Sequence, residues 1–302
     1  MPLVAGVDCS TQSTKVLIVD SDTGSIVATG RSGHHVTGSG GARETDPLVW
    51  WKALASALAD SGRASEVEAI SVDGQQHGMV VLDQSGAPMR RAKLWNDSES
   101  STDATALIQA TGGPDWWAEH IGLVPVASFT ATKWAWLRRV EPDVAAATAA
   151  IRLPHDFLNE RLTGLGTTDR GDGSGTAWWS TATEQYAQEV LDLAALELDT
   201  ALLPAVLGPQ EAAGEVTTAA AGYLGLTTGI PVGPGTGDNA GAALGLGLDS
   251  GTPVISLGTS GTAFMVSRTR TVDPSGTVAG FADATGRFLP LAATLNLSLI
   301  HI

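Results

Sequence analysis

The sequence predicts an α/β fold with two similar halves, and three observations support this. Residues 5–19 and 255–266 each join two apolar, β-rich runs through a turn of Gly, Ser and Thr. A helical pattern follows the first strands, and polar groups gather where predicted strands end. The tips of such hairpins display backbone N–H groups and hydroxyls, so two copies in one chain indicate a duplicated fold that holds a polyphosphate between its halves.

The beginning of the chain predicts a three-stranded meander and one helix. The strands are expected at residues 3–8, 14–20 and 25–30. A polar, Gly-rich loop follows over residues 31–45. A helix then starts at Asp46-Pro47, because an acidic cap followed by proline is typical of helix N-termini, and Gly62 ends it. Its apolar residues recur on one face, so we expect this helix to be structural.

The remaining elements are predicted with the same patterns. Strands are expected at 69–72 and 79–82, on either side of a polar segment at 73–78. The region from 98 to about 225 is predicted to be mainly helical, with helices at 131–140, 142–150 and 185–196 and a loop at 162–176. The last elements are a strand at 231–233, a turn at 234–239, a small-residue helix at 240–245, and hairpin strands near 254–257 and 262–267.

Charge and composition limit the classes of function. The chain has 17 basic and 32 acidic residues and a net charge of −15, which argues against general attraction to nucleic acid or anionic lipid. No apolar stretch is long enough to span a bilayer, and no signal peptide is recognised. The single cysteine, Cys9, excludes an intrachain disulfide and fits a reducing compartment, so we expect a cytoplasmic protein.

Asp8 ends the first strand just before a Ser/Thr-rich tip. A carboxylate beside phosphate oxygens would repel them unless Mg²⁺ lies between, so Asp8 is a candidate metal ligand acting through water. The alternative is an Asp that caps its own turn. The phosphate-binding interpretation depends on the pair of tips, whose candidate residues are Ser10, Thr11 and Ser13 in the first, and Gly258, Thr259 and Ser260 in the second.

Asp238 follows a Gly-rich turn and begins a helix, where the helix dipole favours the ionised carboxylate. It is a candidate general base for a hydroxyl that attacks phosphorus, since the neighbouring glycines leave room for a substrate. A plain helix N-cap is the alternative.

The segment Gln75 to Gly78 places two amides and an imidazole at a strand end, which suits a polyhydroxylated ligand. For His77 alone, the alternative is a hydrogen-bonded structural histidine. Trp95-Asn96-Asp97 adds an aromatic face beside polar groups, which suits a sugar and is equally compatible with ordinary packing. Lys133 is expected to be a solvated helix lysine. The chain has no G-x-x-x-x-G-K-[ST] motif, so a nucleotide site would use the hairpins.

Taken together, these segments resemble the FGGY family of carbohydrate kinases, most closely its xylulokinases. The resemblance rests on segments that occur in family order: 8–15, 46–51, 75–78, 94–97, 129–137, 153–158, 237–240 and 257–261. It implies a ribonuclease H-like (actin-type ATPase) fold, with a complete N-terminal sugar-binding domain over 1–247 and the beginning of a truncated second domain over 248–302.

The resemblance also implies the chemistry. Members of the family phosphorylate a sugar hydroxyl with ATP and Mg²⁺. By matching positions, Asp238 would deprotonate the 5-hydroxyl of D-xylulose, in xylose catabolism, and Asp8 would position the hydrated Mg²⁺. Gln76, His77, Asp238 and Asn239 would contact the sugar, and the two tips would hold the β- and γ-phosphates.

Three departures from the family pattern affect these expectations. Gln76 stands where many xylulokinases have Met, and Ser10 replaces a glycine of the first tip. Family members continue through a whole second domain with an adenosine motif, whereas this chain ends in the hexapeptide Leu297 to Ile302. We therefore expect a truncated or frameshifted gene model.

Two alternatives stay open at this stage. Another kinase of the same family would act on ribulose, gluconate or glycerol. The chain as written could instead be a sugar-binding fragment without kinase activity. The sequence leaves the oligomeric state open, with a homodimer as one option.

Overall fold

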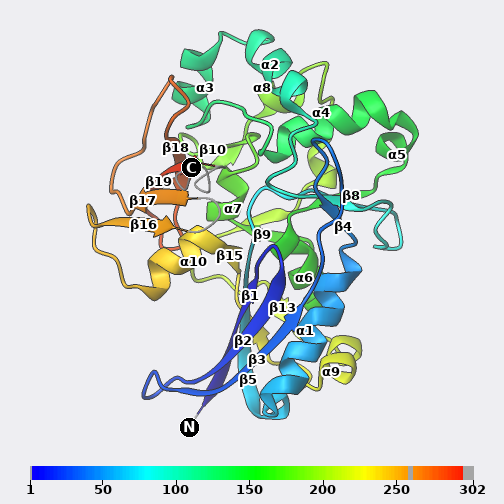
Figure 1. Ribbon diagram of the computed structural model, residues 1–302, viewed down its shortest axis with the longest axis vertical. Coiled ribbons are helices and arrows are strands. Elements are labelled where there is room, and N and C mark those ends of the chain that lie inside the picture. Colours follow the sequence, from blue (N-terminus) through cyan, green and yellow to red (C-terminus); the bar gives the residue numbers. More distant parts are fainter. Residues whose placement is uncertain (1, 258–260, 295–302) are drawn as a thin grey trace, which may run out of the picture. The chain divides into compact units, whose positions relative to one another are not determined.

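The structure is a computed structural model that describes residues 2–257 and 261–294 (Figure 1). It divides into two compact units, which are described separately. The first unit comprises Met1–Trp95, Ala147–Asp169 and Ala201–Asp238, and the second Asn96–Ala146, Arg170–Thr200 and Asn239–Ile302.

A mixed sheet organises the first unit. Its strands are β1 (Leu3–Cys9), β2 (Ser13–Asp20), β3 (Ile26–Gly33), β5 (Val67–Gly74), β13 (Gly214–Glu215), β14 (Pro231–Val232) and β15 (Thr236–Gly237). The predicted meander is confirmed, because β1, β2 and β3 pair antiparallel in chain order. On the other side of β1, the strand β5 pairs with it in parallel, and β14 and β15 pair in parallel with β5.

Three helices accompany this sheet: α1 (Leu48–Ser61), α6 (Pro154–Thr163) and α9 (Thr218–Leu224). The predicted start and end of α1 are confirmed, since the Asp46 carboxylate accepts the Leu48 N–H at 2.9 Å and Gly62 takes the left-handed conformation with φ of 68°. Helix α1 lies along β3 (Figure 1) and buries Trp50, Leu54 and Leu58 in the core of the unit.

Short elements complete the first unit. The paired strands are β4 (Glu44–Thr45) with β7 (Ala92–Lys93), β6 (Val80–Leu82) with β8 (Ala150–Arg152), and β9 (Thr167–Asp169) with β12 (Ala205–Leu207). Two short 3₁₀ segments lie at η1 (Ala64–Glu66) and η2 (Thr200–Leu202), the second of which spans a unit boundary.

The second unit combines small helices with an antiparallel sheet. Its helices are α2 (Ser101–Gln109), α3 (Pro114–His120), α4 (Thr130–Val140), α7 (Arg170–Ser174) and α8 (Gln188–Leu191), while α5 (Pro142–Ala147) and α10 (Asp238–Gly245) span unit boundaries. Its sheet has the order β16 (Pro253–Leu257), β17 (Gly261–Met265), β19 (Phe288–Thr294) and β18 (Ala279–Ala282), and β10 (Trp179–Ser180) pairs with β11 (Gln185–Tyr186).

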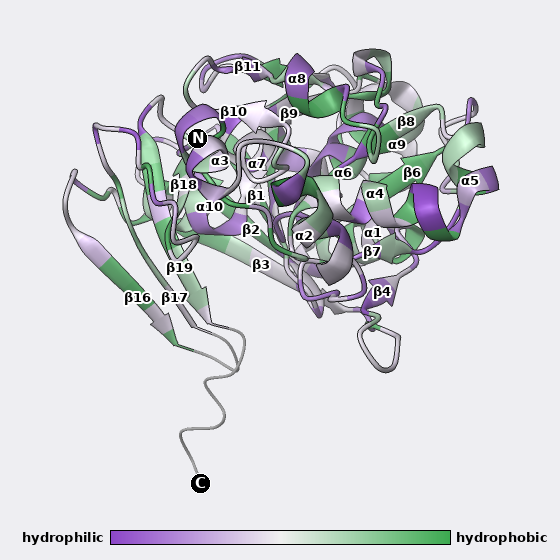
Figure 2. Ribbon diagram, turned by 90° about the horizontal axis from the view of Figure 1, so that it is seen from above, coloured by the Kyte–Doolittle hydropathy of each residue, from purple (hydrophilic) through white to green (hydrophobic). Residues whose placement is uncertain are grey.

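The second predicted hairpin is formed by β16 and β17, which pair antiparallel. Its tip, residues 258–260, lies outside the described residues. Figure 2 shows hydrophobic residues along both strands, and Ile255 and Leu257 are 70% and 75% exposed. Strand β16 therefore presents apolar side chains to solvent in the part of the chain that the structure describes.

Three sequence predictions in the helical region are wrong. The helix expected at 142–150 ends at Ala147, because β8 takes the residues from Ala150 to pair with β6. The loop expected at 162–176 contains β9 and α7, whose Gly and Asp residues are buried.

The helix expected at 185–196 is reduced to the single turn of α8. Residues 185 and 186 pair with β10, and the Leu198 N–H turns back to the Leu191 carbonyl at 2.9 Å. The Leu196 carbonyl accepts the indole N–H of Trp134 at 2.9 Å. Tertiary pairing therefore replaces the helical hydrogen bonds that local propensity favours.

Among residues 2–257 and 261–294, no helix combines the length and the apolar character needed to cross a bilayer.

Candidate active site

Three aspartates of the first unit meet at one edge of its sheet. Asp8 and Asp73 are direct partners across the parallel strands β1 and β5, and Thr236 of β15 is the partner of Asp73 on its other side. Asp238 follows β15 immediately and begins α10. The carboxyl ends of adjacent parallel strands are a common place for ligand sites, so the register alone brings together candidates that are distant in sequence.

The first tip is ordered around Asp8. One carboxylate oxygen of Asp8 accepts the Ser10 hydroxyl at 2.6 Å, and the other pairs with Lys15 Nζ at 2.7 Å. The Thr11 hydroxyl accepts the indole N–H of Trp95 at 3.0 Å, whereas Ser13 is buried in β2 with 4% exposure. Of the three residues predicted to bind phosphate in this tip, Ser10 and Thr11 are partly exposed and Ser13 is buried.

The donor set fits a hydrated Mg²⁺. The Asp8 side chain is 32% exposed and offers carboxylate oxygens, which Mg²⁺ prefers while keeping most of its waters. Burial raises the pKa of Asp73, and repulsion from the charges of Asp8 and Asp238 raises it further. A cation at this edge would reduce that repulsion.

Asp73 is the residue that the sequence analysis missed as a site candidate. Burial is the main cause that raises its pKa to about 8, followed by the charges of Asp8 and Asp238. Its Oδ1 atom is buried and has no hydrogen-bond partner within residues 2–257 and 261–294. The pairing of β1 with β5 identifies it, because Asp8 and Asp73 are direct partners near the ends of these two strands.

Asp73→Asn should change how stability depends on pH. A carboxyl whose pKa is raised in the folded state binds its proton more tightly there than in the unfolded chain, so stability is lost as pH rises from about 4 through about 8. Asparagine carries no such charge, and at pH 9 we expect the variant to exceed the wild type by roughly 1–3 kcal/mol. Urea unfolding at pH 5, 7 and 9 measures this, and parallel pH profiles for the two proteins would refute it.

The predicted sugar loop lies beside the Asp238 turn. Gln76 is 5% exposed, and a Cβ added to Gly237 would lie 2.5 Å from Gln76 Cγ, so the Gln76 side chain packs on the backbone just before Asp238. His77 has a φ of 65°, a conformation that a residue with a side chain adopts at a cost of about 1–3 kcal/mol and that clusters at functional sites. Gln75 is buried, and its side-chain amide makes no hydrogen bond among the described residues.

Other predicted residues belong to the second unit. Asn239 follows Asp238 directly in the chain, and its side-chain oxygen accepts a hydrogen bond from the Thr262 hydroxyl at 3.3 Å. Gly258, Thr259 and Ser260 of the second tip lie outside the described residues. The structure therefore brings Asp8, Gln76 and Asp238 to one region of the first unit and leaves the second tip undescribed.

The expectation of a solvated Lys133 is wrong. Lys133 is fully buried in α4, and its ammonium group donates to the carbonyl of Ala127 at 3.1 Å and to that of Ser128. These carbonyls satisfy a charge that would otherwise be expensive to bury. Lys133 therefore fixes the loop before α4.

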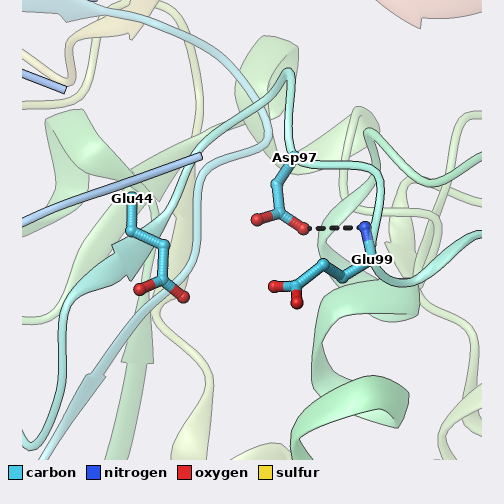
Figure 3. A group of neighbouring side chains, drawn as sticks. All are labelled: Glu44, Asp97 and Glu99. Carbon is cyan, nitrogen blue, oxygen red and sulfur yellow. Dashed lines mark hydrogen bonds between the residues drawn. The ribbon is translucent and has the colours of Figure 1, made fainter. Parts of the chain in front are cut away.

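The acidic side chains around Trp95-Asn96-Asp97 have structural partners. In the second unit, the Asp97 carboxylate accepts the Glu99 N–H at 3.1 Å (Figure 3). In the first unit, Glu44 pairs with Arg90 at 2.6 Å and with Lys93 at 3.4 Å.

Comparisons with known proteins show which family the chain is similar to. The model of the FGGY family of carbohydrate kinases, N-terminal domain, matches residues 3–245. The chain is 58% identical over 299 residues to the xylulose kinase of Streptomyces coelicolor and 57% identical to that of Streptomyces rubiginosus. Each match covers 99% of this chain and 61% of the relative, so the chain spans about three fifths of their length.

Solved structures confirm the predicted fold class. The crystal structure of xylulose kinase from Bifidobacterium adolescentis matches with a TM-score of 0.88 and 41% identity, covering 99% of this chain and 66% of that one.

Proposed function

The chain belongs to the FGGY family of carbohydrate kinases, and from this premise we propose that it transfers the γ-phosphoryl group of ATP to the 5-hydroxyl of D-xylulose, in xylose catabolism. The observation that carries the proposal is that Asp8 near the end of β1 and Asp238 just after β15 lie on either side of Asp73 of β5, with which both strands pair in parallel, in a chain 58% identical to a xylulose kinase. Kinases of ribulose, gluconate or glycerol are not favoured, because both curated relatives described above are xylulose kinases.

Asp238 is the proposed general base. It would accept the proton of the sugar 5-hydroxyl as that oxygen attacks phosphorus, and its place at the start of α10 favours the ionised carboxylate that this role needs. Gln76, which packs on Gly237, together with His77 and Asn239, would bind the other hydroxyls and hold the sugar in position.

The phosphates are assigned to the two hairpin tips. Ser10, Thr11 and Ser13 in the first tip, and Gly258, Thr259 and Ser260 in the second, would contribute hydroxyls and backbone N–H groups. Asp8 would hold the waters of Mg²⁺, which when bound neutralises charge on the transferred group. Lys15, whose ammonium group pairs with the Asp8 carboxylate at 2.7 Å, would lie beside the same phosphates.

The remaining predictions are part of this proposal. We keep the division into a sugar-binding domain over 1–247 and a following domain from 248, and the reducing, cytoplasmic setting expected from a single cysteine.

A substrate panel tests the proposed function. With ATP and Mg²⁺, the protein should release ADP with D-xylulose at a kcat/KM at least tenfold above the values for D-ribulose, D-gluconate and glycerol. Phosphorus NMR should identify the product as a 5-phosphate. Binding of D-xylulose measured by calorimetry without ATP separates sugar recognition from transfer. A higher kcat/KM for another sugar in the panel would reassign the substrate, and binding without ADP release would favour the sugar-binding alternative.

A further inference from the structure

A buried polar network lies behind the turn that carries Asp238. Thr236 is 7% exposed in β15, two residues before Asp238, and its hydroxyl donates to Asp169 Oδ2 at 3.0 Å. Asp169 ends β9 and is 4% exposed. Its other carboxylate oxygen lies 3.8 Å from Nε2 of His155, a fully buried residue of α6. The turn thus bonds Asp169 of β9, which lies beside His155 of α6, through side chains that the proposed chemistry does not use.

The same helix also holds the backbone of this turn. Asn159 lies one helical turn after His155 and donates its amide to the Pro234 carbonyl at 2.9 Å. Between these contacts, Gly235 has a φ of 79°, and a Cβ there would lie 2.6 Å from both His155 Cδ2 and the Val72 carbonyl oxygen. Residues 234–236 are therefore held by close packing and one hydrogen bond to α6, and by the hydrogen bond from Thr236 to Asp169 of β9.

We propose that Thr236 is a positioning residue for the reaction: by bonding Asp169, its hydroxyl fixes the direction in which the chain leaves β15 and so places the Asp238 carboxylate. This inference rests on the proposed function, because it assigns Asp238 the role of base. Thr236 acts only through Asp238. Misplacement of a reacting group by about 1 Å costs on the order of 100-fold in rate, so a single lost hydrogen bond at this point has a measurable effect.

Two substitutions separate the hydroxyl from the shape of the side chain. Thr236→Val keeps the branched shape and removes the hydroxyl, and we expect kcat for D-xylulose to fall by about 10- to 100-fold with little change in the KM for ATP. Thr236→Ser keeps the hydroxyl and should retain kcat within about threefold of the wild type. Thr163→Val is the matched control, because the Thr163 hydroxyl is buried on α6 but bonds the Asn159 carbonyl at 2.8 Å, within the helix. It should lower stability without lowering kcat.

The decisive measurement is a double-mutant cycle in the full-length protein. If Thr236 acts through Asp238, Thr236→Val should lower kcat in the wild-type background and cause no further loss in the Asp238→Asn background. A purely structural role would lower kcat in both backgrounds, or change it in neither, and would overturn the inference. A wild type that prefers another sugar would overturn the substrate assignment while leaving the cycle measurable with that sugar, whereas a wild type inactive on every sugar would overturn both.

Discussion

Asp238→Asn is expected to lower kcat for D-xylulose phosphorylation by about 10²- to 10⁴-fold, the range that loss of a general base produces. Asparagine has nearly the same shape and still accepts and donates hydrogen bonds, but its amide cannot take the proton of the attacking hydroxyl. The KM for D-xylulose should change only modestly, because most sugar contacts are assigned to Gln76, His77 and Asn239. Steady-state ADP release with varied sugar gives both constants.

A partly exposed aspartate, Asp83, provides the control for this substitution. The Asp83 carboxylate accepts hydrogen bonds from Ser85 and Ala87 within its own turn. Asp83→Asn should therefore leave kcat unchanged, which separates the effect of position from that of losing one negative charge. Turnover like the wild type in Asp238→Asn would remove Asp238 from the role of base and leave the plain N-cap as its explanation.

Gly30→Ala should be the most destabilising small substitution in the first unit. Gly30 lies in β3 where α1 crosses it, and an added Cβ would lie 1.8 Å from the Ala57 carbonyl oxygen and 2.9 Å from the Ser61 nitrogen. Both neighbours are helix backbone, so relief requires α1 to move away from the sheet and would open the core around Trp50 and Leu54. We expect a loss of roughly 3 kcal/mol or more, or failure to fold.

Gly6→Ala is the matched control in the same sheet. Gly6 lies in β1, and a Cβ there would meet no atom within 4 Å. Its effect on the urea midpoint should be within the roughly 0.5 kcal/mol typical of surface substitutions. Equal stability of the two alanine variants would contradict the close packing of α1 on β3 at Gly30.

The elements that were predicted correctly are those with local signals. The meander follows from alternating apolar residues and short turns, and α1 follows from Asp46-Pro47 at its start and Gly62 at its end. Where a segment forms its hydrogen bonds with residues distant in sequence, the secondary structure predicted from local patterns was wrong. The pattern of residues 185–196 predicts a helix. Residues 185 and 186 instead pair with β10, and the Leu196 carbonyl accepts the indole N–H of Trp134. The burial of Lys133 could not be predicted for the same reason. The carbonyls that accept hydrogen bonds from its ammonium group belong to a loop whose conformation local sequence patterns do not predict.

The candidate site divides in the same way. Asp8, Gln76, His77 and Asp238 could be identified from the sequence, because each stands at a strand end or helix start in a recognisable motif. Asp73 was overlooked, since nothing in its own segment distinguishes it from an ordinary turn residue. The hydrogen bond from Thr236 to Asp169 could not be predicted from the sequence either, because it joins β15 to β9, which are far apart in the chain.

The sequence by itself determined the fold class, the family resemblance and which residues are candidates for the chemistry, since these depend on residue type and short-range spacing. Only the tertiary structure decided that Asp8 and Asp73 lie side by side near the ends of β1 and β5, that Asp238 follows β15 at the same edge, and that α6 supports the Asp238 turn. The physical reason is strand register: pairing β1, β5 and β15 in parallel aligns their carboxyl ends and concentrates negative charge there, and that alignment is fixed by long-range packing.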